Sequence, residues 1–132
     1  MIAKVEWQSE QVYKATSDSG HTLTFDVAHA QGPTPMEAVL MALCGCTSVD
    51  VIIILQKKRE PFTALTVSAT AEKASTSPSV FTKIELVYKV TGPVNRKSME
   101  DAVRLSKEKY CSVSAMLEKT AAIAHRIEYV HG

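Results

Sequence analysis

The first part of the chain alternates apolar and polar residues with a period of two. Residues 3–7, 12–16 and 22–26 each follow this alternation, which is typical of half-buried strands. The polar turn residues Ser9-Glu10 and Ser17-Asp18-Ser19-Gly20 separate them. The pattern therefore predicts antiparallel hairpins within residues 1–27.

A long apolar run over residues 36–55 follows, and its start carries a clear helix signal. Thr34 is suited to the N-cap, Pro35 to the first helical position and Glu37 to the third, which together make a capping box. Glu37 is fully explained by this cap. We expect the helix to continue to about Lys58, with Pro61 ending it.

The second half returns to strand and helix patterns. It predicts strands over 63–73 and 80–91, a helix over 97–109, a shorter helix over 112–120 and a last strand over 124–130. This order indicates one α+β domain spanning 1–132, with antiparallel sheets around a long central helix. Because one small sheet cannot cover so apolar a helix alone, we expect a homodimer.

Composition excludes several classes of protein. The 132 residues carry 15 basic and 14 acidic side chains, and this net charge of +1 argues against a nucleic-acid partner. Residues 38–55 approach the length of a membrane span, but Thr47, Ser48 and Asp50 suit lipid poorly. We therefore expect a buried core helix and no membrane. With no secretory signal and an odd number of cysteines, three, reduced thiols in the cytoplasm are the better fit.

Cys46 and Cys111 are the candidate reactive residues. Cys46 lies deep in the long helix, where an unneutralised Asp50 four residues later would raise the pKa of its thiol. Cys111 opens the helix predicted over 112–120, where backbone N–H groups and nearby Lys109 favour its thiolate. Such a residue suits the role of resolving a sulfenic acid into a disulfide.

The alternative interpretations stay open at this point. A cysteine in an apolar helix is most often a small core residue, and we assign Cys44 that role. Thr47 and Ser48 are expected to bond back to their own helix. The four histidines show no metal-ligand spacing, so no metal site is predicted.

Two segments, residues 33–46 and the run Tyr110-Cys111-Ser112-Val113-Ser114, resemble the OsmC/Ohr family of thiol peroxidases. The match extends over nearly the whole chain and is nearest to a short branch of that family. The resemblance implies an intertwined homodimer with active sites at the interface. It also implies that Cys46 attacks a small organic hydroperoxide and that Cys111 then closes a disulfide with it.

The resemblance implies no cofactor; an external dithiol, such as a lipoylated protein, would reduce the disulfide. The family's active-site glutamate falls at Met36 here, one residue before Glu37. Its arginine has no counterpart, because no arginine precedes Arg59. Lys14 and Lys4 are candidate substitutes, although a lysine lacks the planar guanidinium fork. Arg104 and Arg126 are other candidates, since a dimer could bring either near Cys46. Glu37 and Asp50 are further supporting residues.

Two other functions remain compatible with the residues. The chain could be a non-catalytic binding protein that holds a hydrophobic ligand in a cleft at the dimer interface. It could also be a redox sensor whose reversible disulfide changes partner binding. The missing arginine–glutamate pair favours the binding protein, whereas the two cysteines in register favour the enzyme.

Overall fold

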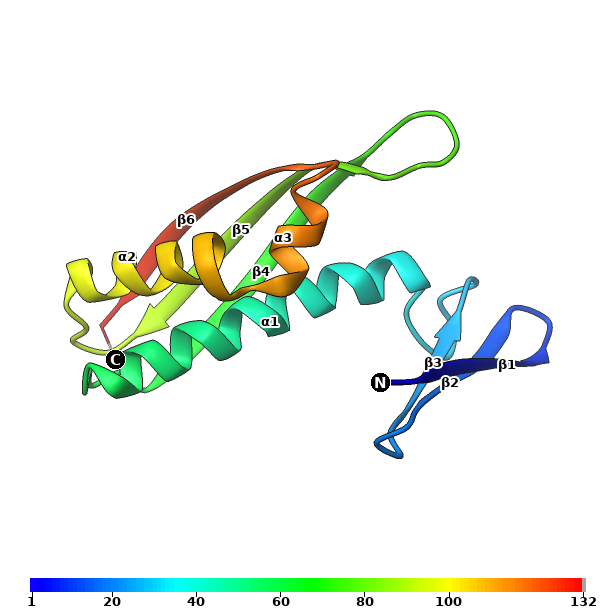
Figure 1. Cartoon of the computed structure of the whole chain (residues 1–132), viewed down its shortest axis with the longest axis horizontal. Coiled ribbons are helices and arrows are strands. Elements are labelled where there is room, and N and C mark those ends of the chain that lie inside the picture. The colour runs from blue at the N-terminus through cyan, green and yellow to red at the C-terminus, as the bar shows by residue number, and fades with distance from the viewer. Residues whose placement is uncertain (132) are drawn as a thin grey trace. The chain divides into compact units, whose positions relative to one another are not determined.

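The computed structural model describes residues 1–131. The chain divides into two compact units, with the boundary in the sequence between residues 40 and 41. Figure 1 follows the chain from the N-terminal strands, through one long helix, to a second sheet with its own helices. The predicted α+β composition is confirmed by this order of elements.

The first unit contains the predicted hairpins. Its strands are β1 (Ala3–Ser9), β2 (Val12–Ser17) and β3 (Thr22–Asp26), which pair antiparallel in the order β1-β2-β3. Directly paired residues share one face of a sheet. The pairs Val5↔Ala15 and Ala15↔Leu23 therefore belong to an apolar face that also holds Trp7, Tyr13 and Phe25. Val5, Trp7 and Leu23 stay more than half exposed.

The long helix α1 (Pro35–Lys57) begins at the predicted cap. Thr34 N–H donates to Glu37 Oε1 at 2.9 Å, and Glu37 N–H donates to Thr34 Oγ1 at 3.2 Å. This reciprocal pair satisfies two backbone donors that the first turn would otherwise leave free. The capping box predicted from the sequence is confirmed.

The helix ends shortly before Pro61. Arg59 takes a left-handed conformation with φ 57°, and its N–H donates to Gln56 O at 3.0 Å. The next N–H, of Glu60, reaches back to Leu55 O at 3.0 Å. These two bonds form a Schellman motif, which closes the helix although the left-handed position is not a glycine.

The second sheet contains β4 (Ala64–Lys73), β5 (Phe81–Thr91) and β6 (Ala122–Val130), in that order. β4 and β5 are antiparallel as predicted, but β6 runs parallel to β5, so the expectation of purely antiparallel sheets is wrong for this strand. The helical segment between β5 and β6 is the physical reason. It returns the chain to the starting end of β5, as a parallel pair requires.

That crossover contains α2 (Arg96–Leu105), the π-helical turn η1 (Ser106–Tyr110) and α3 (Ser112–Leu117). The helix predicted over 97–109 is thus α2 continued by a π turn, and the helix predicted over 112–120 ends at Leu117. Asn95 caps α2 by accepting from Ser98 N–H at 3.0 Å.

The core of the second unit is formed mainly by α1, β5 and α2. Buried α1 residues recur every four positions, which places them along one side of the helix. The fully or almost fully buried side chains from these three elements are Leu43, Thr47, Val51, Leu55, Ile84, Leu86, Tyr88, Val90, Met99, Ala102 and Val103.

By length and composition alone, α1 could also cross a membrane. A core helix of a globular protein passes the same test. The buried stripe of α1 and the hydrogen bonds of its polar side chains to β5 and η1 support the core-helix interpretation. The absence of a membrane partner stays a prediction.

Candidate functional site

Cys111 lies at the junction of η1 and α3 and is almost completely buried, with 2% of its surface exposed. Its N–H donates to Ser106 O at 2.8 Å, which closes the π turn. Its sulfur accepts from Ser114 N–H at 3.4 Å and thereby caps α3. The prediction that Cys111 opens a helix is confirmed.

The π turn gives this junction its shape. A π-helix contains one more residue per hydrogen-bonded turn than an α-helix. Such turns are rare in proteins as a whole, but those that occur are frequently at functional sites. Here the turn begins with Ser106, which is fully buried, and ends immediately before Cys111. Sequence reasoning had no signal for it, because the stretch has ordinary helical residues.

Cys46 lies in the middle of α1, half-buried, and interacts with Cys111 across the space between α1 and the start of α3. The two cysteines come from elements far apart in the sequence, yet each belongs to the same compact unit. Both are free thiols in this structure. The structure therefore brings together the two cysteines that the sequence singled out.

The surroundings of Cys111 favour the neutral thiol. Burial raises the pKa of the Cys111 thiol to about 11, and the neighbouring Cys46 and Asp50 raise it as well. The hydrogen bond from Ser114 N–H acts in the opposite direction, as expected for a helix start. The predicted help from a backbone N–H group is therefore present, but burial outweighs it and the neutral thiol is favoured.

A chain of buried polar groups joins α1 to η1 and β5 beside the cysteines. Thr47 Oγ1 lies 2.7 Å from Tyr88 Oη and 2.7 Å from Ser106 Oγ. Ser106 Oγ in turn donates to Asp50 Oδ2 at 2.8 Å. Asp50 is thus tied to the turn that carries Cys111, a contact that the sequence did not predict for this supporting residue.

Sequence reasoning assigned Thr47 to its own helix and did not single out Ser106 or Tyr88. Ser48 does bond back to Cys44 O, at 2.6 Å, as predicted. Thr47 instead bonds to distant elements, so that prediction is wrong. A polar residue in the buried stripe of an apolar helix was the available signal, because such a group needs a partner.

Glu37 and Lys14 belong to the first unit. The Glu37 carboxylate accepts from Thr34 N–H and lies 3.2 Å from His29 Nδ1. Lys14 pairs with Glu6 and Thr24 on the polar face of the first sheet. The second unit brings Cys46, Cys111 and Asp50 together without them, and the supporting roles of Glu37 and Lys14 stay predictions.

Cys44 lies on a different side of α1 from Cys46 and is half-buried. Burial raises the pKa of the Cys44 thiol, which disfavours the reactive thiolate. Its neighbour Gly45 leaves open space where a side chain would stand. The structural role of Cys44 stays a prediction.

A groove of about 400 Å³ opens beside Asp50, between the second half of α1 and the end of α2. Apolar side chains form most of its wall, and two lysines line it as well, one at the end of α1 and one directly after it. The lining residues are Asp50, Ile53, Ile54, Lys57, Lys58, Leu105 and Tyr110. Because Tyr110 directly precedes Cys111, the groove adjoins the cysteine site.

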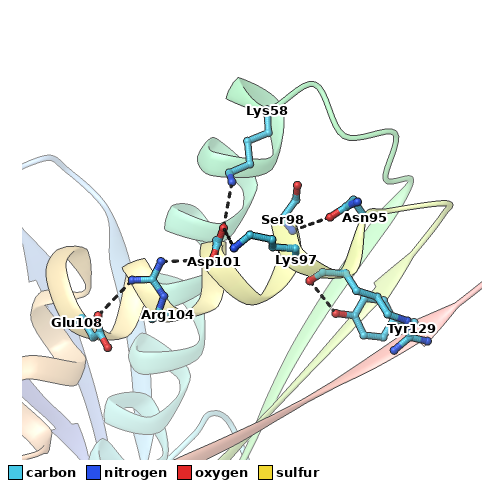
Figure 2. Close-up of polar contacts among 9 residues, drawn as sticks. Lys58, Asn95, Lys97, Ser98, Asp101, Arg104, Glu108 and Tyr129 are labelled. Atoms are coloured by element: carbon cyan, nitrogen blue, oxygen red, sulfur yellow. Dashed lines mark hydrogen bonds and ion pairs between the residues drawn. The ribbon is translucent and has the colours of Figure 1, made fainter.

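Ion pairs link the groove residue Lys58 to α2. Figure 2 shows Asp101 of α2 between Lys58, which directly follows α1, and two cations of its own helix, Lys97 and Arg104. The distances from Asp101 are 3.6 Å to Lys58 Nζ, 3.5 Å to Lys97 Nζ and 3.3 Å to Arg104 Nη2. The Lys58 pair links the end of α1 to α2.

Comparison with known proteins identifies the family. The sequence model of the family described as OsmC-like protein matches residues 28–126. The chain belongs to the OsmC-like family. Protein YhfA of Escherichia coli K12 is 42% identical to it over 132 residues, with 98% of each chain covered. The resemblance inferred from the two cysteine segments is confirmed.

Solved structures show the same fold. A hypothetical protein of Aquifex aeolicus is 30% identical, with a TM-score of 0.90 over 99% of this chain and 96% of that one. An organic hydroperoxide resistance protein, OsmC, of Legionella pneumophila is 14% identical, with a TM-score of 0.72 over 96% and 95%. At that identity the second likeness concerns the fold alone.

Proposed function

We propose that this protein is a thiol peroxidase that reduces organic hydroperoxides through Cys46. The observation that carries the proposal is the meeting of a half-buried Cys46 with a buried Cys111 inside one unit. The OsmC-like family and the shared fold of the Legionella hydroperoxide resistance protein support a redox role.

The reaction has two chemical steps. Cys46 Sγ attacks the distal oxygen of the hydroperoxide, the O–O bond breaks, and the alcohol leaves with a proton, so that Cys46 becomes a sulfenic acid. Cys111 Sγ then attacks Cys46 Sγ, which forms the disulfide and releases the sulfenic oxygen as water. The hydroperoxide is reduced by two electrons, and the two thiols are oxidised by two.

An external dithiol completes the cycle. One thiolate of the dithiol attacks the Cys46–Cys111 disulfide, and its second thiol resolves the mixed disulfide by exchange. A lipoylated protein is a suitable reductant because it carries two adjacent thiols. In this mechanism the protein needs no cofactor or metal of its own.

The proposed active form is a homodimer in the cytoplasm. The first sheet leaves Val5, Trp7 and Leu23 exposed, and α1 leaves Met41 and Val49 exposed. Apolar surfaces of this kind on a small protein are typical of an interface. Three free cysteines agree with a reducing compartment.

The groove between α1 and α2 supports a second candidate function. Its apolar wall, with Lys57 and Lys58 at the end of α1, suits a small hydrophobic ligand with a negative charge. In that case the protein would bind the ligand without turning it over. A redox sensor is the third candidate, and slow oxidation without efficient turnover would indicate it.

Peroxide consumption tests the proposal. The reduced protein is mixed with cumene hydroperoxide or with hydrogen peroxide, in the presence of dihydrolipoate, and the mass of the thiol peptides is followed. We expect faster loss of the organic peroxide and a disulfide between Cys46 and Cys111. Cys46→Ser should abolish turnover, whereas Cys111→Ser should stop after a single oxidation.

Cys44→Ser is the matched control, because it removes a cysteine two residues away on the same helix. It should keep the wild-type rate. Normal turnover by Cys46→Ser would show that the assignment of the reacting residue is wrong. Unmodified thiols and no peroxide loss in the wild-type protein would favour the binding protein instead.

A further inference from the structure

Asp50 stands at the end of the buried hydroxyl chain and close to both cysteines. It follows Cys46 by one helical turn on the same side of α1, since residues four apart are neighbours on a helix. Its charge is also among those that act on Cys111. These hydrogen bonds run from Tyr88 through Thr47 and Ser106 to Asp50.

The direction of every bond in this chain follows from counting hydrogens. A hydroxyl group has one hydrogen to donate, and an ionised carboxylate only accepts. Ser106 uses its hydrogen on Asp50, so Thr47 must donate to Ser106. Tyr88 must then donate to Thr47.

Tyr88 can fill that role because burial keeps it protonated, raising the pKa of its phenol to about 12. All three hydroxyl groups therefore point their hydrogens toward Asp50. Chains of hydrogen bonds aligned in this way polarise one another and strengthen the last bond. The arrangement fixes the orientation of the carboxylate at the point where α1 meets the Cys111 turn.

Only one of the two carboxylate oxygens is occupied by this chain. Ser106 binds Oδ2, and within residues 1–131 no hydrogen bond is formed to Oδ1. Asp50 also lines the groove beside the cysteines. It therefore has one oxygen held in place and the other available to accept a proton.

We propose that Asp50 is the general base that takes the proton of Cys111 when Cys111 attacks the oxidised Cys46. This inference rests on the peroxidase function proposed above. The Cys111 S–H bond breaks toward Asp50, the sulfur electron pair forms the S–S bond, and the Cys46 S–O bond breaks. The departing hydroxide takes the proton back from Asp50 and leaves as water.

The second step needs such a base more than the first. Asp50 is bonded to Ser106 at the start of the turn that ends just before Cys111, so its carboxylate is placed for the second step. Cys111 is buried and must lose a proton to react. Two other ionisable side chains of η1 are engaged elsewhere, since Glu108 contacts Arg104 and Lys107 donates to Ile123 O at 2.8 Å.

Single-turnover kinetics on the full-length protein separates the two steps. The reduced protein is mixed with one equivalent of cumene hydroperoxide and quenched at intervals, with dimedone to label the sulfenic acid. Mass spectrometry then gives sulfenic acid and disulfide against time. In Asp50→Asn we expect disulfide formation to be roughly 100-fold slower, in the usual range for a lost general base.

The same variant should form the sulfenic acid at the wild-type rate, because in this mechanism Asp50 takes no part in the attack on the peroxide. A purely structural role would not slow one step and spare the other. Glu108→Gln is the matched control, since it removes an exposed carboxylate three residues before Cys111. It should leave both rates unchanged.

Ser106→Ala keeps the carboxylate but removes its hydrogen-bond donor, and it tests the proposal even if Asp50→Asn folds poorly. We expect disulfide formation to slow by roughly tenfold, the effect of misorienting a base without removing it. Equal rates of disulfide formation in the wild type and both variants, with sulfenic acid formed in all, would overturn the role of Asp50. Absence of sulfenic acid in the wild type would instead overturn the peroxidase function.

Discussion

Thr47 on α1 and Tyr88 on β5 hold their side-chain oxygens 2.7 Å apart, and both residues are at most 2% exposed. This bond joins the long helix to the second sheet inside an otherwise apolar core. Ser106 of η1 meets Thr47 at the same distance, so three elements converge on one hydroxyl group. A buried polar group costs free energy when it loses its partners.

The substitution Thr47→Val should destabilise the protein. It keeps the shape of the side chain but leaves the Tyr88 hydroxyl without its acceptor. We expect the free energy of unfolding to fall by about 1–3 kcal/mol. Urea denaturation of the wild type and the variant measures the difference.

Thr82→Val is the matched control for that experiment. Thr82 lies on the same strand as Tyr88, but its side chain is exposed and bonds to Glu72 O at 3.3 Å. We expect a change within about 0.5 kcal/mol. A Thr47→Val protein as stable as this control would show that the buried bond contributes nothing to the fold.

The high pKa of Cys111 predicts a specific loss of stability in alkali. Its pKa is about 11 in the folded protein, compared with an ordinary value of 9.0. The unfolded chain therefore releases the proton first as the pH rises, and the folded state loses stability between about pH 9 and 11. Below pH 9 this contribution is fully present.

Urea midpoints measured from pH 8 to pH 11 test this effect. Tyr88 and other groups also titrate at high pH, so the informative quantity is the difference between the wild type and Cys111→Ser. The wild-type midpoint should fall more steeply through this window. Parallel curves for the two proteins would mean that the Cys111 thiol ionises as readily when folded as when unfolded.

Much of the fold could be predicted because its signals are local. The alternation in residues 1–27 and the Thr34–Glu37 cap act within a few residues, and both structures form as predicted. The direction of β6 and the π turn depend on how the crossover packs. Periodicity contains no information on that packing, so these two features were missed.

The site was predicted less completely, for a related reason. The pairing of Cys46 with Cys111 came from family resemblance, since nothing in their spacing requires it. Thr47 was assigned to its own helix because threonine commonly bonds there. Its actual partners, Ser106 and Tyr88, lie 59 and 41 residues away, and only the folded chain brings them close.

The Asp101 ion pairs predict a stability that depends on pH and salt. The hydrogen bond from Arg104, together with the charges of Lys97 and Lys58, holds the pKa of Asp101 below its ordinary value of 3.8. A lowered carboxyl pKa stabilises the fold above that value, and the stabilisation is lost as the pH falls through the folded pKa. Asp101→Asn should therefore be less stable than the wild type at pH 7.

The difference between the two proteins should shrink below about pH 3.8, where Asp101 of the unfolded chain is protonated. It should also shrink at pH 7 in about 1 M salt, because exposed charges are screened. Thermal unfolding of the two proteins at pH 7, at pH 7 with added salt and below pH 3.8 measures the effect. A difference that is the same at every pH and salt concentration would assign the role of Asp101 to packing.

The exposed side of α1 predicts dimerisation. Met41, Val49 and Ile53 are between 45% and 62% exposed and lie on the side of the helix opposite its buried stripe. If this side packs against a second copy, Val49→Glu buries an unpaired charge there and should dissociate the dimer. Light scattering after gel filtration should then give the mass of two chains for the wild type and of one for the variant.

Thr82→Glu adds the same charge at an exposed position of the second sheet, and it should remain a dimer. Peroxide turnover by the Val49→Glu monomer adds a second result. In a single chain the apolar face of the first sheet stays exposed to solvent. If a second copy covers this face and completes the active site, the monomer should lose peroxide turnover. A wild-type protein that elutes as one chain would contradict the proposed dimer, and a fully active monomer would place the whole site within one chain.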